Sequence, residues 1–310
     1  TGSVWVRVAP AHPEAPGAPE PETVVGVDDG HVAVRDPREP VDAPSSQNYR
    51  RFRVSGTFGA DASQGDVHET IGVPAVDWLL DGFNSTLVAF GEVGTGKTHS
   101  LFGGAGGERS WQDQGLCGNV ISQLFERVEA APSEFVVGIS AWEILNNDTF
   151  DLLAYPVEPN PSTQPTFTNV RTNSRAAALK VLERARAGSQ NWTHGGAHDS
   201  EPFVSLPNSA HAFVRLTLVN VQKRRCSTVH LVDLAGSQSL DRRHSPRAFQ
   251  ITAENAKERK NINQQLLAFS RVVQEMSQAN EGRGDSVASE VKLISMRDSR
   301  LTQVLGPVMA

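Results

Sequence analysis

An apolar tetrapeptide followed by a glycine-rich octapeptide constrains this chain more than any other stretch. Residues 87–90 read Leu-Val-Ala-Phe, enough for one buried strand, and residues 91–98 fit the pattern G-x-x-x-x-G-K-[ST]. Glycines let the backbone curl so that several N–H groups point at one anion, a lysine reaches terminal phosphates, and a threonine hydroxyl can ligate Mg²⁺. The residues expected to contact a nucleotide are Gly91, Glu92, Val93, Gly94, Thr95, Gly96, Lys97 and Thr98. A glycine-rich turn that carries a lysine by chance is the alternative, but it explains neither Thr98 nor a second motif further along.

The composition argues against several classes of protein. The chain has 310 residues, 38% hydrophobic and 21% charged, which suits one large α/β domain or two small ones. No run approaches the roughly 18 apolar residues of a membrane span, and the N-terminus shows no secretory signal. Cys117 and Cys226 form neither a disulfide framework nor a zinc-type spacing, so a reducing, intracellular compartment is expected. The net charge of −6 argues against a nucleic-acid-binding protein.

The hydrophobic pattern predicts strands and helices in mixed order. Strands are expected at residues 4–8, 52–58, 87–90, 135–145, 213–221 and 228–232, the last two in hairpin relation, with another hairpin over 24–34. Residues 149–153 form a short apolar run. Helices are expected at residues 66–80, 116–130, 174–187, 253–276 and, as a beginning, 297–305. No internal repeat is present.

The second motif is an apolar strand that ends in an aspartate and continues into small residues, over residues 228–237. An enzyme that transfers phosphoryl groups needs an acidic residue at such a strand end to hold water on Mg²⁺. It also needs a glycine N–H close to the γ-phosphate. Asp233 and Gly236 fit these roles. The expected catalytic set is therefore Lys97, Thr98, Asp233 and Gly236, with Thr98 and, through water, Asp233 serving the metal.

Several stretches resemble, in order and spacing, the kinesin motor domain: residues 6–10, 90–99, 142–146, 151–153, 232–237, 262–266 and 297–302. The resemblance implies the α/β fold of P-loop NTPases, a central mixed β-sheet flanked by helices on both faces. It implies one domain over residues 1–310 that stops before the family's last strand, last helix and neck linker. It further implies ATP or ADP with Mg²⁺ as ligands. The implied partners are the microtubule (α/β-tubulin) and other microtubule-associated or axonemal proteins, with no nucleic acid and no membrane. The implied location is the cytoplasm and cytoskeleton, in a ciliary axoneme if the array is a stable one.

Carried over by position, Arg7, Pro10 and His99 would clamp the adenine, the first with its guanidinium plane and the others with flat faces. Ala9 stands where the family's first-strand motif has a second arginine, so one contact is expected to be missing. The alternative is that these three residues merely end a strand and begin a helix.

The first switch departs from the family, in which a serine-rich run with an arginine ends in Ser-His. Residues 207–211 keep His211, but Ser209 replaces the arginine and Asn208 replaces a magnesium-side serine. Gln238 replaces the glutamate that pairs with this arginine. Because that pair closes the two switches around the γ-phosphate, the resemblance implies an ATPase of slow turnover. A misplaced gap before residue 208 would account for Ser209 but not for Gln238. An active microtubule-stimulated motor and a phosphotransferase from outside the family stay open as alternatives.

Charge is spread unevenly along the chain. Residues 241–300 hold eleven Lys and Arg against eight Asp and Glu, a net of +3 in a chain of net charge −6. By resemblance, the acidic tubulin surface would be met by residues 241–250, 253–276 and 297–305. The arginines expected on this microtubule face are Arg242, Arg243, Arg247, Arg297 and Arg300. Each of them, taken singly, could equally be an ordinary surface residue.

Overall fold

The computed structural model describes residues 2–8, 25–28, 30–35, 49–104, 114–129, 133–162, 165–189, 209–237, 253–281 and 296–309. The chain divides into two compact units, Thr1–Val67 and His68–Ala310, and each is described by itself. The expectation of one domain over residues 1–310 stays a prediction.

The first unit consists mainly of short strands. β1 (Trp5–Arg7) pairs in parallel with β5 (Gly56–Phe58), and Trp5 stacks on Phe58 with ring centroids 5.5 Å apart. β2 (Val25–Asp28), β3 (His31–Arg35) and β4 (Tyr49–Arg53) form an antiparallel sheet in that order. The hairpin expected over residues 24–34 is confirmed, and the positive φ of 74° at Gly30 supplies its turn. The short helix α1 (Gln64–Val67) ends the unit.

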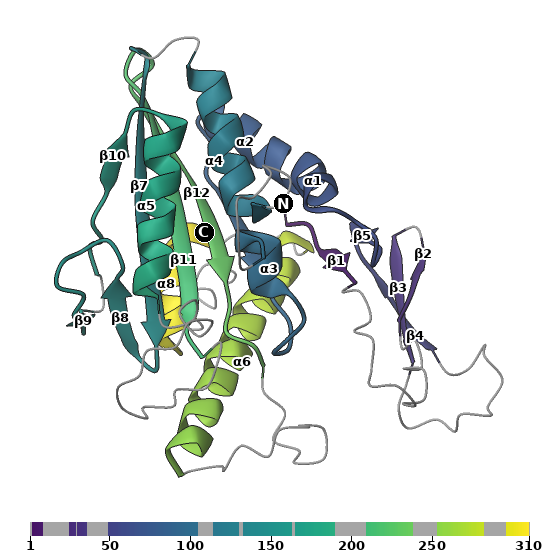
Figure 1. Ribbon diagram of the computed structural model, residues 1–310. Coiled ribbons are helices and arrows are strands. Elements are labelled where there is room, and N and C mark those ends of the chain that lie inside the picture. The colour runs from purple at the N-terminus through teal and green to yellow at the C-terminus, as the bar shows by residue number, and fades with distance from the viewer. Residues whose placement is uncertain are drawn as a thin grey trace, which may run out of the picture. The chain divides into compact units, whose positions relative to one another are not determined.

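The second unit is built on a seven-stranded sheet with the order β6-β12-β11-β7-β8-β9, in which β10 also pairs with β7 (Figure 1). The strands are β6 (Ser85–Ala89), β7 (Phe135–Leu145), β8 (Asp148–Asp151), β9 (Pro159–Asn160), β10 (Val170–Thr172), β11 (His211–Asn220) and β12 (Arg225–Asp233). β12 is parallel to β6 and antiparallel to β11, so the sheet is mixed, as expected.

Helices cover both faces of this sheet, which confirms the predicted fold class. The helices are η1 (His68–Gly72), α2 (Val73–Leu80), α3 (Lys97–Phe102), α4 (Gly115–Val128), α5 (Arg175–Gly188), α6 (Ala253–Glu281) and α8 (Arg300–Met309). Figure 1 shows α5 in front of the strands and α8 behind them. None of the described helices combines the length and the apolar character that crossing a bilayer requires.

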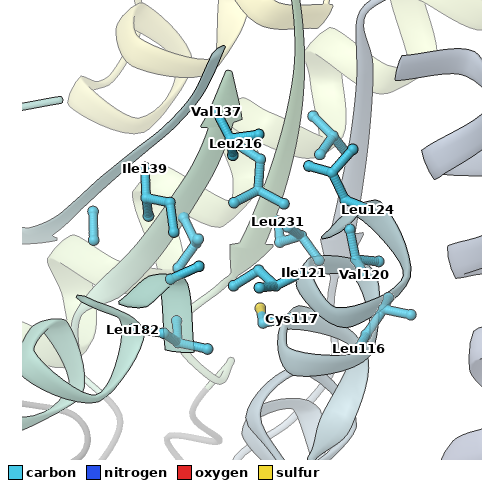
Figure 2. Packing of buried hydrophobic residues seen from close by; sticks show 14 of the residues in the cluster. Leu116, Cys117, Val120, Ile121, Leu124, Val137, Ile139, Leu182, Leu216 and Leu231 are labelled. Atoms are coloured by element: carbon cyan, nitrogen blue, oxygen red, sulfur yellow. The ribbon is translucent and has the colours of Figure 1, made fainter. Parts of the chain in front are cut away.

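Two hydrophobic clusters fill the spaces between the sheet and its two helical layers. Figure 2 shows Leu116, Val120 and Leu124 of α4 near Leu216 and Leu231 of the sheet. On the opposite face, Phe213 and Val232 pack with α6 and α8 residues such as Leu266 and Leu301. Because side chains alternate along a strand, β7, β11 and β12 each contribute to both clusters.

Two expectations about local structure are wrong. Residues 66–80 do not form one regular helix, because a π-helical turn, η1, separates α1 from α2. Pro74 in the first turn of α2 has no N–H to donate backwards, so the ordinary helical ladder cannot run through this point. The strand before the glycine-rich loop is half-buried rather than buried, and Phe90 is 56% exposed. Among the described strands β6 pairs only with β12, which leaves it at the sheet edge.

Candidate functional site

The glycine-rich loop lies between β6 and α3 and is folded on itself. Gly94 and Gly96 have φ values of 85° and 84°, a region that side chains disfavour. A Cβ at either glycine would meet no described atom within 4 Å, so this part of the loop faces open space. The carbonyl of Glu92 accepts hydrogen bonds from the Thr95 hydroxyl at 2.9 Å and from Lys97 Nζ at 2.6 Å. The loop therefore has the backbone shape of an anion-binding cradle.

Lys97 is a buried ammonium at the start of α3. Burial lowers its pKa, while the negative charges of Asp233 and Glu92 act in the opposite direction. Within the described residues Nζ makes one hydrogen bond, to Glu92, although an ammonium carries three donors. Lys97 therefore has donors left for a phosphate oxygen.

Thr98 and Asp233 meet directly, although 135 residues separate them in the sequence. The Thr98 hydroxyl donates to Asp233 Oδ2 at 2.6 Å, where β12 ends beside β6. Burial raises the pKa of Asp233 to about 6, and the Thr98 hydrogen bond and the Lys97 charge partly offset this. The buried Oδ1 atom has no hydrogen-bond partner among the described residues. A hydroxyl beside an unpaired carboxylate oxygen fits Mg²⁺, which proteins hold with one or two carboxylates, water and substrate phosphates.

The residues after β12 run alongside the glycine-rich loop. Leu234 N–H donates to Ala89 O at 3.2 Å and Ser237 N–H donates to Gly91 O at 3.3 Å, which extends the parallel β6–β12 pairing. Gly236 faces Val93 so closely that a Cβ would lie 2.7 Å from the Val93 nitrogen. Only glycine fits at this contact.

His211 connects the start of β11 to the residues after β12. Its Nδ1 accepts the Ala235 N–H at 3.0 Å, and Nε2 has no partner among the described residues. Burial lowers the pKa of His211 to about 3, so the imidazole is neutral at pH 7. Ser209 is also buried, at 3% exposure. Asn208 and Gln238 lie outside the described residues, so the loss of the switch pair stays a prediction.

The described structure does not test the expected adenine clamp, because its residues lie in different units or outside the described residues. Arg7 lies in the first unit, where its guanidinium donates to Gln64 Oε1 at 2.8 Å and to Ala62 O at 3.1 Å. Burial lowers the pKa of Arg7, against the charge of Asp66. His99 is exposed on α3, and Pro10 lies outside the described residues. The adenine clamp stays a prediction.

Arg300, one of the arginines predicted for the microtubule face, is buried instead of exposed. It is 7% exposed, and its Nη2 donates to Thr149 Oγ1, Asn160 O and Ser162 O. Arg297 is exposed, as expected, whereas Arg242, Arg243 and Arg247 lie outside the described residues.

The structure shows exposed cations on α6 that were not predicted for the microtubule face: Lys257, Lys260 and Arg271. Their helical spacing relative to the buried Ile262, Leu266 and Phe269 would have identified them as solvent-facing. Sequence reasoning also missed Glu143, Ser189 and Arg186, whose contacts come from distant parts of the chain and leave no local signal.

A phosphate loop after a strand, followed by a helix that begins with Lys-Thr, and an aspartate at the end of the neighbouring parallel strand define a P-loop NTPase fold. Comparison with known sequences narrows this class to one family. The kinesin motor domain model matches residues 22–310, and the chain belongs to this family.

The alignments with known relatives cover most of this chain but only a minor part of each relative's length. Kinesin-like protein KIF11 of Xenopus tropicalis is 28% identical over 276 residues, which is 83% of this chain and 24% of that protein. KIF18B of Gallus gallus is 28% identical over 330 residues, which is 98% of this chain and 38% of that protein. This chain thus spans a quarter to two fifths of the length of these relatives.

Solved structures show the same fold. A structure of Drosophila NOD, fitted together with bovine tubulin into a map of nucleotide-free NOD on the microtubule, is 26% identical with a TM-score of 0.66. It matches 98% of this chain and 84% of its own chain. A fast kinesin is 22% identical with a TM-score of 0.68, over 98% of this chain and 80% of its own, and this likeness concerns the fold alone.

Proposed function

We propose that this chain is a kinesin-like microtubule-binding protein that binds ATP or ADP with Mg²⁺ and hydrolyses ATP slowly. Its role would be static or regulatory rather than that of a fast motor. The observation that carries the nucleotide-binding half is the 2.6 Å hydrogen bond between Thr98 and Asp233 beside the buried Lys97.

Nucleotide binding is supported by the charges and donors around the loop. Lys97 would bind the terminal phosphates, and the open backbone at Gly94 and Gly96 would receive the others. Thr98 and the unpaired Oδ1 of Asp233, acting through water, would hold Mg²⁺. The metal would supply neutralisation of charge on the β- and γ-phosphates.

Slow hydrolysis is supported by the absence of a charged side chain at Ser209 and His211, near the start of β11. Ser209 stands where the family resemblance expects an arginine, and it is too short to reach across a site. His211 cannot replace the missing cation, because burial keeps its pKa at about 3. Loss of one such charge-stabilising contact can cost about 10³-fold in turnover.

Microtubule binding is supported by family membership and by the exposed cations of α6 and Arg297. A tubulin surface rich in carboxylates would attract such a face. A static microtubule-bound protein of this kind would suit a stable array such as a ciliary axoneme. A fluorescent fusion of the full protein tests this location, and a diffuse cytoplasmic signal would count against it.

A working microtubule-stimulated ATPase is the second candidate. The observation in its favour is that Lys97, Thr98, Asp233 and Gly236 are all present and arranged around one loop.

A steady-state ATPase assay with and without microtubules separates the two candidates, and co-sedimentation measures binding in the same samples. We expect binding without strong stimulation. Turnover above about 1 s⁻¹, the low end for ordinary enzymes, would establish the active motor instead.

The pair Ser209→Arg and Gln238→Glu tests the cause of slow turnover. Together the changes should raise hydrolysis. Ser209→Arg alone is the control and should destabilise the fold, because it buries an unpaired charge at a 3% exposed position. If the double variant folds and hydrolyses no faster, the loss of this pair is not the cause.

A further inference from the structure

The last turn of α5 contacts the far end of the helix that follows the phosphate loop. Arg186 Nη1 donates to the Phe102 carbonyl at 3.1 Å, and its guanidinium lies 6.0 Å from the centroid of the Phe102 ring. Phe102 is the last residue of α3 and is almost fully buried. A cation at a helix C-terminus also interacts favourably with the helix dipole. Arg186 therefore holds the C-terminal end of α3.

Holding one end of α3 holds the other, because the helix is short. It has six residues, which corresponds to about 9 Å of rise. Lys97 and Thr98 stand in its first turn, and Gly103 caps it with an N–H donated to His99 O at 2.9 Å. A tilt at Phe102 therefore shifts the ammonium and the hydroxyl that face the loop.

The end of α5 that carries Arg186 is itself held in place by a buried hydrogen bond. Ser189, just after α5, donates its hydroxyl to Glu143 Oε2 at 2.8 Å. Ser189 and Glu143 are 0% and 1% exposed, and Glu143 lies in the middle of the sheet, paired with Ala212 of β11. The C-terminal end of α5 is thus fastened to the sheet on one side and to α3 on the other.

The charges of Arg186 and Asp233 both act on the thiol of Cys117. The thiol of Cys117 on α4 is buried, which raises its pKa well above the usual value. The negative charge of Asp233 adds to this rise and the positive charge of Arg186 opposes it.

We propose that Arg186 is a positioning residue of the nucleotide site, which fixes Lys97 and Thr98 in place by gripping the C-terminal end of α3 from α5. It touches no nucleotide itself. The proposal rests on the proposed binding of nucleotide at the phosphate loop.

Arg184 provides a matched control two residues earlier on the same helix. Its Nη2 also donates to a backbone carbonyl at 3.1 Å, but that of Leu153 instead of α3. Arg186→Gln therefore removes the bond to Phe102 O, and Arg184→Gln removes the bond to Leu153 O. Arg186→Lys keeps the charge and one donor, and serves as the conservative variant.

The experiment measures three quantities for each purified variant: the dissociation constant of a fluorescent ADP analogue with Mg²⁺, the melting temperature, and the amide exchange rate of Gly103 without nucleotide. For Arg186→Gln we expect binding weaker by about tenfold or more, as for loss of a hydrogen bond to a charged group, and faster exchange at Gly103. Arg184→Gln should leave both unchanged, and Arg186→Lys should recover most of the affinity.

The outcomes separate this proposal from the function on which it rests. If the unmodified protein binds no nucleotide, the proposed function fails, while faster Gly103 exchange in Arg186→Gln alone would still support the grip on α3. If the unmodified protein binds nucleotide and the two glutamine variants behave alike, Arg186 has no positioning role. A fall in melting temperature without any change in affinity or exchange would overturn the proposal in the same way.

Discussion

Replacing Arg300 by methionine distinguishes a residue that holds the fold together from one that docks to a partner. Methionine keeps most of the side-chain length and removes every donor. Arg300 Nη2 carries two N–H groups and lies within hydrogen-bonding reach of Thr149 Oγ1, Asn160 O and Ser162 O. Two hydrogen bonds from a charged donor contribute about 1.5–3 kcal/mol each, so Arg300→Met should cost about 3–6 kcal/mol. For a unit of this size the melting temperature should fall by at least about 6 °C.

Urea unfolding and microtubule co-sedimentation measure the two roles separately. Arg297→Met is the control, because Arg297 is exposed three residues earlier. It should change the free energy of unfolding by less than about 0.5 kcal/mol, while weakening microtubule binding if the proposed face is correct. Arg300→Met should lose stability, and its folded fraction should bind microtubules as the unmodified protein does.

Two results would refute this reasoning about Arg300. One is a variant as stable as the unmodified protein, which would mean that the three oxygens do not need the guanidinium. The other is a stable variant that binds microtubules more weakly than Arg297→Met, which would restore Arg300 to the docking surface.

Three further predictions concern the site itself. Gly236→Ala would place a Cβ 2.7 Å from the backbone nitrogen of Val93, so it should separate the two segments and weaken binding of a fluorescent nucleotide; unchanged affinity would contradict the contact. Thr98→Val keeps the shape but removes the hydroxyl that donates to Asp233, so nucleotide affinity should lose its dependence on Mg²⁺ in a titration with the metal. The folded pKa of His211, about 3, lies below the unfolded 6.5, so only the unfolded state takes up a proton as pH falls below 6.5. Stability should then fall by up to about 1.4 kcal/mol per pH unit, and urea unfolding of His211→Gln at pH 7 and 5 should show less of this loss.

The elements around the site were predictable because their signals are local. The strand that ends at Asp233 and the loop that ends at Lys97 are each encoded by a continuous run of residues. Residues 213–221 and 228–232 were predicted as two strands in hairpin relation, and β11 and β12 differ from these bounds by only a few residues. The meeting of Thr98 and Asp233 followed from the roles that both motifs play around one metal ion.

Long-range contacts of charged side chains could not be predicted in this way. Arg300 lies in a polar run of the sequence, and the oxygens to which it donates lie 138 to 151 residues away in the chain. The grip of Arg186 on Phe102 crosses 84 residues and has no sequence pattern. The neighbouring sequence does not distinguish a solvent-facing arginine from one whose hydrogen-bond acceptors come close only in the folded protein.

The alternation of β12 between two interiors has a consequence for the acidic strand end. Leu231 belongs to the cluster under α4, and Val232 belongs to the cluster under α6 and α8. A shift of β12 by one residue along its pairing with β6 and β11 would exchange the faces of these two side chains. The packing of the two clusters therefore fixes the register of β12. Because Asp233 is the last residue of β12, the same packing fixes its position. Substitutions that leave the side chains of Leu231 and Val232 in place should therefore leave the position of Asp233 along β12 unchanged.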